Sequence, residues 1–65
     1  PQANVHIWPG RSPEEKSQLM SGITEVLVGL GIPEHAVSVL VHEVPMDSWG
    51  EGGRPATEWC GAPPG

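Results

Sequence analysis

The sequence predicts a small α/β protein with the order strand, helix, strand, followed by a C-terminal β-hairpin or turn. Residues 3–8 alternate apolar and polar side chains, and residues 36–44 are rich in valine, as expected of strands. Residues 12–30 instead repeat their apolar side chains at helical spacing. Because a helix connects the two strands, we expect them to be parallel and joined by a right-handed crossover.

The first strand has one strictly apolar face. This face consists of Ala3, Val5 and Ile7, and the opposite face carries Asn4, His6 and Trp8. Pro9 and Gly10 then interrupt the strand. One face of this strand is therefore expected to pack against the rest of the protein.

The helix has recognisable start and stop signals. Ser12 is a candidate N-cap, Pro13 suits the first helical position, and Glu15 occupies the place of a capping-box acid. Gly31, followed by Pro33, supplies the stop. One apolar stripe is expected along the helix, formed by Leu19, Met20, Ile23, Val26, Leu27 and Leu30.

The second strand is apolar on both faces over most of its length. One face carries Val37, Val39 and Val41, and the other carries Ser38, Leu40 and His42. One helix can cover only one face of a two-stranded sheet, so the face with Leu40 and Trp8 would contact water in a monomer. The sequence therefore predicts an oligomer in which copies pack these faces together. After Pro45, the glycine-rich segment DSWGEGGRPATEW predicts the hairpin or turn.

The chain is expected to form one domain over residues 1–56, with residues 57–65 as a tail that has no core-forming pattern. A protein of 65 residues buries only about 60% of its unfolded surface, so its core alone gives little stability. A single cysteine, Cys60, excludes an intrachain disulfide, and no spacing typical of a structural zinc site occurs. Self-association is therefore the remaining way to stabilise the fold.

Charge and hydropathy exclude several classes of partner. The net charge is −5 and the chain has only three cationic side chains, which argues against nucleic acid. No apolar run is long enough to span a membrane, and one cysteine without an export signal favours a reduced, cytoplasmic setting. We expect no metal: His6 and His42 can lie side by side on adjacent strands, but as packed or hydrogen-bonded side chains.

Four features, in this order, resemble the 4-oxalocrotonate tautomerase family. They are Pro1, the run from His6 to Lys16, the strand ending at Glu43, and WGEGG over residues 49–53. Each feature is weak alone, but their order and spacing in so short a chain are specific. The resemblance covers residues 1 to about 56. It implies a β-α-β protomer, usually assembled as a hexamer, without a cofactor, and an active site completed by neighbouring subunits.

The resemblance also implies roles for particular residues. Pro1 would be the catalytic base, because an N-terminal proline presents a secondary amine that can accept a proton once its surroundings disfavour the ammonium form. Arg11 would bind a substrate carboxylate with its guanidinium group. Trp49 would form an apolar wall, and Trp8 would shape the same pocket. The expected substrate is a small enol or an unsaturated 2-keto acid; its identity and pathway stay open.

Two positions depart from the family's pattern. The best-known members carry a second arginine where this chain has Ser38, so efficient processing of a diacid is in doubt. Whether Ser38 or Arg54 compensates stays open.

At Glu51, tautomerases usually have an aliphatic residue, whereas related dehalogenases use an acid here to activate water. The first alternative function is therefore a hydratase or dehalogenase of 3-haloacrylate-like acids that uses Glu51 and a protonated Pro1. The second is a non-catalytic oligomeric binding protein.

Overall fold

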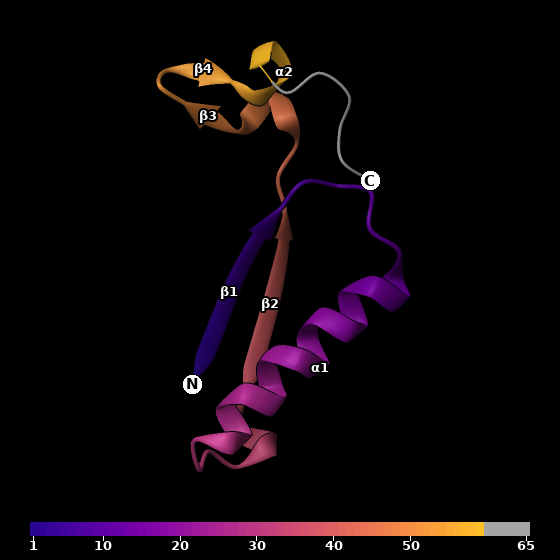
Figure 1. Cartoon of the computed structure of the whole chain (residues 1–65), viewed down its shortest axis with the longest axis vertical. Coiled ribbons are helices and arrows are strands. Elements are labelled where there is room, and N and C mark those ends of the chain that lie inside the picture. Colours follow the sequence, from indigo (N-terminus) through magenta and orange to yellow (C-terminus); the bar gives the residue numbers. More distant parts are fainter. Residues whose placement is uncertain (60–65) are drawn as a thin grey trace.

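The computed structural model describes residues 1–59 and has the predicted β-α-β order, extended by a hairpin and a short helix (Figure 1). The main elements are β1 (Gln2–Ile7), α1 (Pro13–Gly29), β2 (Ser38–Glu43), β3 (Gly50–Glu51), β4 (Arg54–Pro55) and α2 (Ala56–Trp59). Two short 3-10 helices, η1 (Glu34–Ala36) and η2 (Met46–Ser48), lie in the connections. The predicted α/β class is therefore confirmed.

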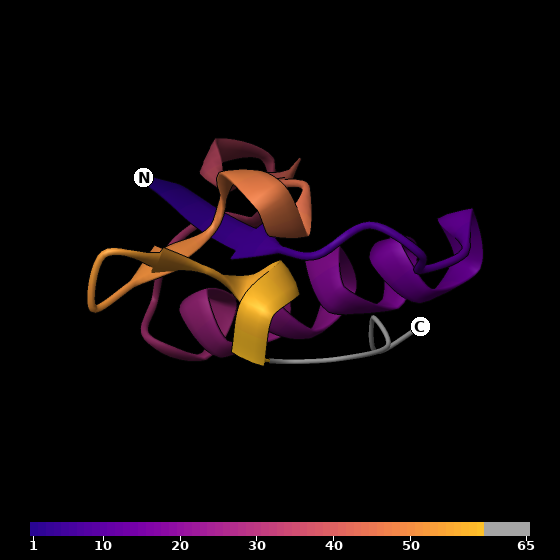
Figure 2. The ribbon, with the colours of Figure 1, turned by 90° about the horizontal axis from the view of Figure 1, so that it is seen from above.

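The two long strands form a parallel pair, as predicted. Their register runs from Gln2 opposite Ser38 to Ile7 opposite Glu43. Along β1, exposed and half-buried residues alternate strictly, and α1 covers one side of the strand pair (Figure 2). The hairpin and α2 lie beyond the carboxyl ends of both strands, whereas the amino end of β1 is at the opposite end of the sheet (Figure 1).

Local hydrogen bonds explain where α1 begins and ends. Ser12 accepts from the Glu15 backbone N–H at 3.1 Å, and a Glu15 carboxylate oxygen accepts from the Ser12 N–H at 2.9 Å. This reciprocal pair is the predicted capping box. At the other end, the Ile32 N–H donates to the Leu27 carbonyl, while Gly31 adopts φ 94°. Gly31 therefore closes the helix in the left-handed conformation that glycine adopts most readily.

The predicted single apolar stripe on this helix is only partly correct. Leu19, Ile23 and Leu27 are half-buried, but Val26 is 66% exposed and Leu30 is 74% exposed. The sheet has only two strands, which lie about 5 Å apart. It therefore covers a narrow line along the helix and leaves the flanking apolar side chains, Met20 among them, in contact with solvent.

The segment after β2 folds into the predicted hairpin. Gly50 pairs with Pro55 and Glu51 with Arg54, while Gly52 and Gly53 occupy the turn with φ values of 62° and 80°. Positive φ at both central residues of a two-residue loop is typical of a type I′ turn, which favours glycine. The chain reverses here and brings α2 back toward η2. The boundary expected between residues 56 and 57 falls inside α2, and residues 60–65, with Cys60, lie outside the described residues.

Very little of this protomer is buried. Among residues 1–59, only Met46 and Ala56 are buried apolar side chains, and Leu40 is exposed on the sheet. The radius of gyration is 14.5 Å, and the principal extents are 42 × 24 × 13 Å. A compact domain of this length has a radius of gyration of about 11 Å. A single copy therefore leaves most of its apolar side chains at least partly exposed to solvent. No helix within the described residues is long and apolar enough to cross a membrane.

Candidate active site

A groove of about 680 Å³ opens where the strands end. Its walls come from the end of β1, the first turns of α1 and the residue before β3. The lining residues are Ile7, Trp8, Arg11, Glu15, Lys16, Gln18, Leu19 and Trp49. Three of the predicted site residues, Arg11, Trp8 and Trp49, therefore share one cavity with apolar walls and two cationic groups.

Arg11 lies just before the helix cap and is held by Glu15. Its Nη1 donates to Glu15 Oε2 at 3.3 Å, and its side chain is 48% exposed. The other oxygen of the same carboxylate accepts from the Ser12 backbone N–H. This backbone hydrogen bond, and secondarily the positive charge of Arg11, lower the pKa of Glu15 below its ordinary value of 4.5. One carboxylate thus caps the helix and fixes the guanidinium at the rim of the groove.

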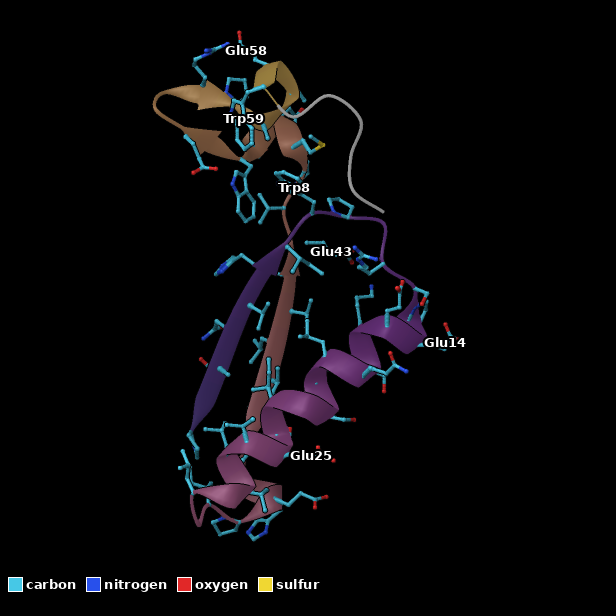
Figure 3. All side chains as sticks on the ribbon, in the orientation of Figure 1. Trp8, Glu14, Glu25, Glu43, Glu58 and Trp59 are labelled. Carbon is cyan, nitrogen blue, oxygen red and sulfur yellow. The ribbon has the colours of Figure 1, made fainter. Side chains whose placement is uncertain are left out.

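Lys16 is a second cation in the groove that the sequence reasoning did not select. Its Nζ donates to Glu43 Oε1 at 2.9 Å, and this ion pair joins α1 to the end of β2. Figure 3 shows Glu43 between the carboxyl end of β2 and the first half of α1. One signal in the sequence could have identified it. Lys16 is the chain's single lysine, and it lies three residues before the apolar Leu19, on the same side of the predicted helix.

Three tryptophans gather above the strands. Trp8 contacts Trp49 edge to face, with ring centroids 5.6 Å apart, and Trp59 with centroids 6.1 Å apart. Figure 3 shows Trp8 between the strand ends and the hairpin, and Trp59 over the hairpin. The prediction that Trp8 lies on the uncovered sheet face is therefore wrong, because it follows β1 and packs under the hairpin instead. Its indole Nε1 is buried and has no acceptor within residues 1–59.

Pro1 and Ser38 lie at the other end of the sheet. The Ser38 N–H donates to the Pro1 carbonyl at 3.0 Å, where Pro1 directly precedes β1 and Ser38 is the first residue of β2. Six strand residues at about 3.3 Å each separate Pro1 from the groove by roughly 20 Å. One protomer therefore does not bring Pro1 and Arg11 together.

Glu51 lies outside the groove as well. It is exposed in β3, opposite Arg54, and the two line a separate shallow hollow of about 430 Å³ with Gly52 and Trp59. Arg54 forms an ion pair with Glu58 at 3.7 Å on this side of the hairpin. Within one protomer, neither residue contacts the space next to Arg11.

The two strand histidines pack as the sequence predicted. The rings of His6 and His42 stack with centroids 4.8 Å apart and planes inclined by 16°, and His42 Nε2 lies 3.0 Å from Asn4 Oδ1. The ring nitrogens of stacked imidazoles point along parallel planes and do not converge on a shared ion. Across residues 1–59, no group of three or more histidine, cysteine, aspartate or glutamate side chains could hold a metal.

Known sequences match this chain over most of its length. A family model described as "Tautomerase enzyme" matches residues 1–58. A 2-hydroxymuconate tautomerase from Comamonas testosteroni is 37% identical over 59 residues, which are 89% of this chain and 94% of that protein. The probable tautomerase K2 from Dickeya dadantii is 40% identical over 60 residues, with 89% and 90% of the two chains covered.

Solved structures agree with these matches. TomN, a 4-oxalocrotonate tautomerase homologue in the tomaymycin biosynthetic pathway, has a TM-score of 0.84 and 39% identity, covering 89% of this chain and 91% of its own. A heterohexamer 4-oxalocrotonate tautomerase from Chloroflexus aurantiacus has a TM-score of 0.79 and 25% identity, covering 89% and 95%. Sequence and fold both match across nearly the full length of these proteins, so the chain belongs to the tautomerase family and is a 4-oxalocrotonate tautomerase-like isomerase.

Proposed function

We propose that this isomerase works without a cofactor, that Pro1 is its general base, and that each active site is completed by a second copy of the chain. The observation that carries this proposal is the division of the candidate residues between the two ends of β1. Pro1 lies beside Ser38 at one end, and Arg11 lies in the groove at the other. A family member with these residues roughly 20 Å apart needs the amino end of one protomer to meet the groove of another.

The proposed reaction moves one proton within a small acid. The Pro1 nitrogen removes a proton from an enol oxygen and returns it to carbon, so the enol becomes the keto form and the amine is regenerated. One base can perform both steps if it is held in place. The Ser38 N–H bond to the Pro1 carbonyl and the closed proline ring support such a fixed position.

Groove chemistry supports a small carboxylate as the substrate. Arg11 can bind a carboxylate in a bidentate manner, and Trp8 and Trp49 can pack against an unsaturated carbon chain. A volume of about 680 Å³ lies within the range of small-molecule sites. We therefore propose a small enol or unsaturated 2-keto acid, such as a phenylpyruvate-type enol. A cytoplasmic location is consistent with the chain's one cysteine.

The assembly we propose is a homohexamer. Two observations on this chain support an oligomer: the near absence of buried side chains among residues 1–59, and the exposed sheet face at Leu40. Apolar surface without cover favours association, because its removal from water is the main driving force for packing. The similar protein from Chloroflexus aurantiacus is a heterohexamer, which supports six subunits as the number.

The hydratase alternative has less support from this structure. Water activation requires Glu51 close to the substrate that Arg11 holds, but within one protomer Glu51 lines the hairpin hollow instead. The alternative of a non-catalytic binding protein loses support from the match to enzymes along nearly the whole chain.

Blocking the amine of Pro1 tests this function. A variant that retains a methionine before Pro1 converts the basic nitrogen into an amide, which cannot accept the proton. Because general acid–base catalysis contributes about 10²–10⁴-fold, we expect kcat/KM for an enol acid to fall at least 100-fold. Intact mass measures which residue begins each preparation, and circular dichroism checks the fold. Unchanged turnover by a correctly folded, methionine-retaining variant would show that Pro1 is not the base.

A further inference from the structure

Lys16 shares the groove with Arg11 and has no role in the reaction described above. Its side chain is 27% exposed, lines the groove, and donates to Glu43 at 2.9 Å. We propose that the Lys16 ammonium binds an anionic oxygen of the substrate, in addition to the carboxylate that Arg11 binds. This inference rests on the proposed function, because it assigns a second contact in the same site.

The scarcity of cations makes this location informative. The chain carries a net charge of −5 and three cationic side chains, two of which line this one groove. An ammonium group has three hydrogen-bond donors, and Glu43 accepts one of them, so donors remain for a ligand. The partial burial of Lys16 also reduces the screening of its charge by water, which strengthens a contact with an anion.

Three residues are candidates for a second contact with the substrate, in addition to Arg11: Ser38, Arg54 and Lys16. Ser38, at the position of the family's second arginine, lies beside Pro1 and would reach the composite site with it, but its hydroxyl is neutral and supplies no positive charge. Arg54 pairs with Glu58 and lines the hollow at the hairpin. Lys16 is the cation that lies in the same cavity as Arg11. The neutral charge of Ser38 and the position of Arg54 in the protomer therefore both favour Lys16 as the second cationic contact.

A purely structural role must be separated from binding, because the Lys16–Glu43 ion pair also joins α1 to β2. The two roles predict different results for the two partners. If the ion pair only holds the helix in place, Lys16→Met and Glu43→Gln remove the same interaction and have the same effect. If the ammonium binds the ligand, only Lys16→Met removes the contact, whereas Glu43→Gln leaves the ammonium free.

The experiment compares adipate with hexanoate, which differ by one carboxylate and undergo no tautomerisation. Binding is followed by the fluorescence of Trp8 and Trp49, which line the groove. We expect the native protein to bind adipate about tenfold or more tightly than hexanoate, because a charge-assisted contact has this magnitude. In Lys16→Met this preference should fall to about one. Lys16→Arg should restore most of it, and Glu43→Gln should keep it.

Arg54→Met is the matched control. It also removes one cation and one ion pair with a glutamate, but at a position outside the groove, so the preference for adipate should stay at its native value. A native preference in Lys16→Met, or an equal loss in Glu43→Gln, would overturn the proposal; loss in Arg54→Met would assign the second contact to Arg54. Neither ligand reacts, so the result is independent of whether Pro1 is the base.

Discussion

Replacing Arg11 by alanine removes the proposed contact with the substrate carboxylate. A hydrogen bond to a charged group contributes about 1.5–3 kcal/mol, and loss of one electrostatic stabiliser in an enzyme costs about 2.7–4 kcal/mol. Two features of the structure place the expected loss of free energy near the lower end of these ranges. The side chain is 48% exposed, so water screens its charge, and it already donates to Glu15 at 3.3 Å. We therefore expect a loss of about 2 kcal/mol in kcat/KM, which is roughly 30-fold.

The assay follows the loss of enol absorbance with a phenylpyruvate-type enol, and again with its methyl ester. The ester lacks the charge that Arg11 is proposed to bind, so Arg11→Ala should slow the acid much more than the ester. Arg54→Ala is the control, since this arginine is 64% exposed and also pairs with a glutamate four residues later. Equal losses for the acid and the ester, or an equal loss in Arg54→Ala, would refute a carboxylate-binding role for Arg11.

Three further predictions concern assembly, specificity and pH. At micromolar concentration, sedimentation should report a hexamer, because one copy buries only two apolar side chains among residues 1–59; a folded monomer would contradict the composite site. The native protein should turn over 3-haloacrylates slowly at most, and Glu51→Gln should leave enol turnover nearly unchanged. Loss of the main activity in Glu51→Gln, or haloacrylate turnover faster than enol turnover, would favour the hydratase. The lowered pKa of Glu15 means that its ionised form stabilises the folded state above pH 4.5, and that this contribution is lost as the pH falls through the folded-state pKa. The Tm advantage of the native protein over Glu15→Gln should therefore shrink between pH 6 and pH 3.

Features that depend on neighbours in the sequence could be predicted from the sequence. The capping box of Ser12 and Glu15 and the stop at Gly31 involve residues within a few positions of one another. The strand alternation and the paired glycines at 52 and 53 are similarly local. Each of these signals reflects backbone hydrogen bonding or allowed φ values, which change little with the rest of the fold. The parallel pairing followed because a helix joins the strands.

Positions that depend on how the elements pack could not be predicted in this way. Periodicity put Trp8 on the open face of β1, but the strand ends at Ile7 and the indole packs under the hairpin. Periodicity likewise predicted one stripe on α1, whereas a two-stranded sheet is too narrow to cover Val26. The sequence pattern specifies the direction of a side chain on its own element, but not the width of the surface that meets it.

The residues of the candidate site also fall into those selected from the sequence and those found only in the structure. Sequence resemblance alone selected Pro1, Arg11 and Trp49, because these residue types recur at fixed places in a family. The predicted strand already separates Pro1, which precedes it, from Arg11, which follows it; only the tertiary structure showed that Lys16 lines the groove together with Arg11. The physical reason is that a strand separates its two ends by about 3.3 Å per residue, whereas the short connection over residues 8–12 keeps the first turns of α1 near the carboxyl end of β1, where packing decides which side chains line the groove.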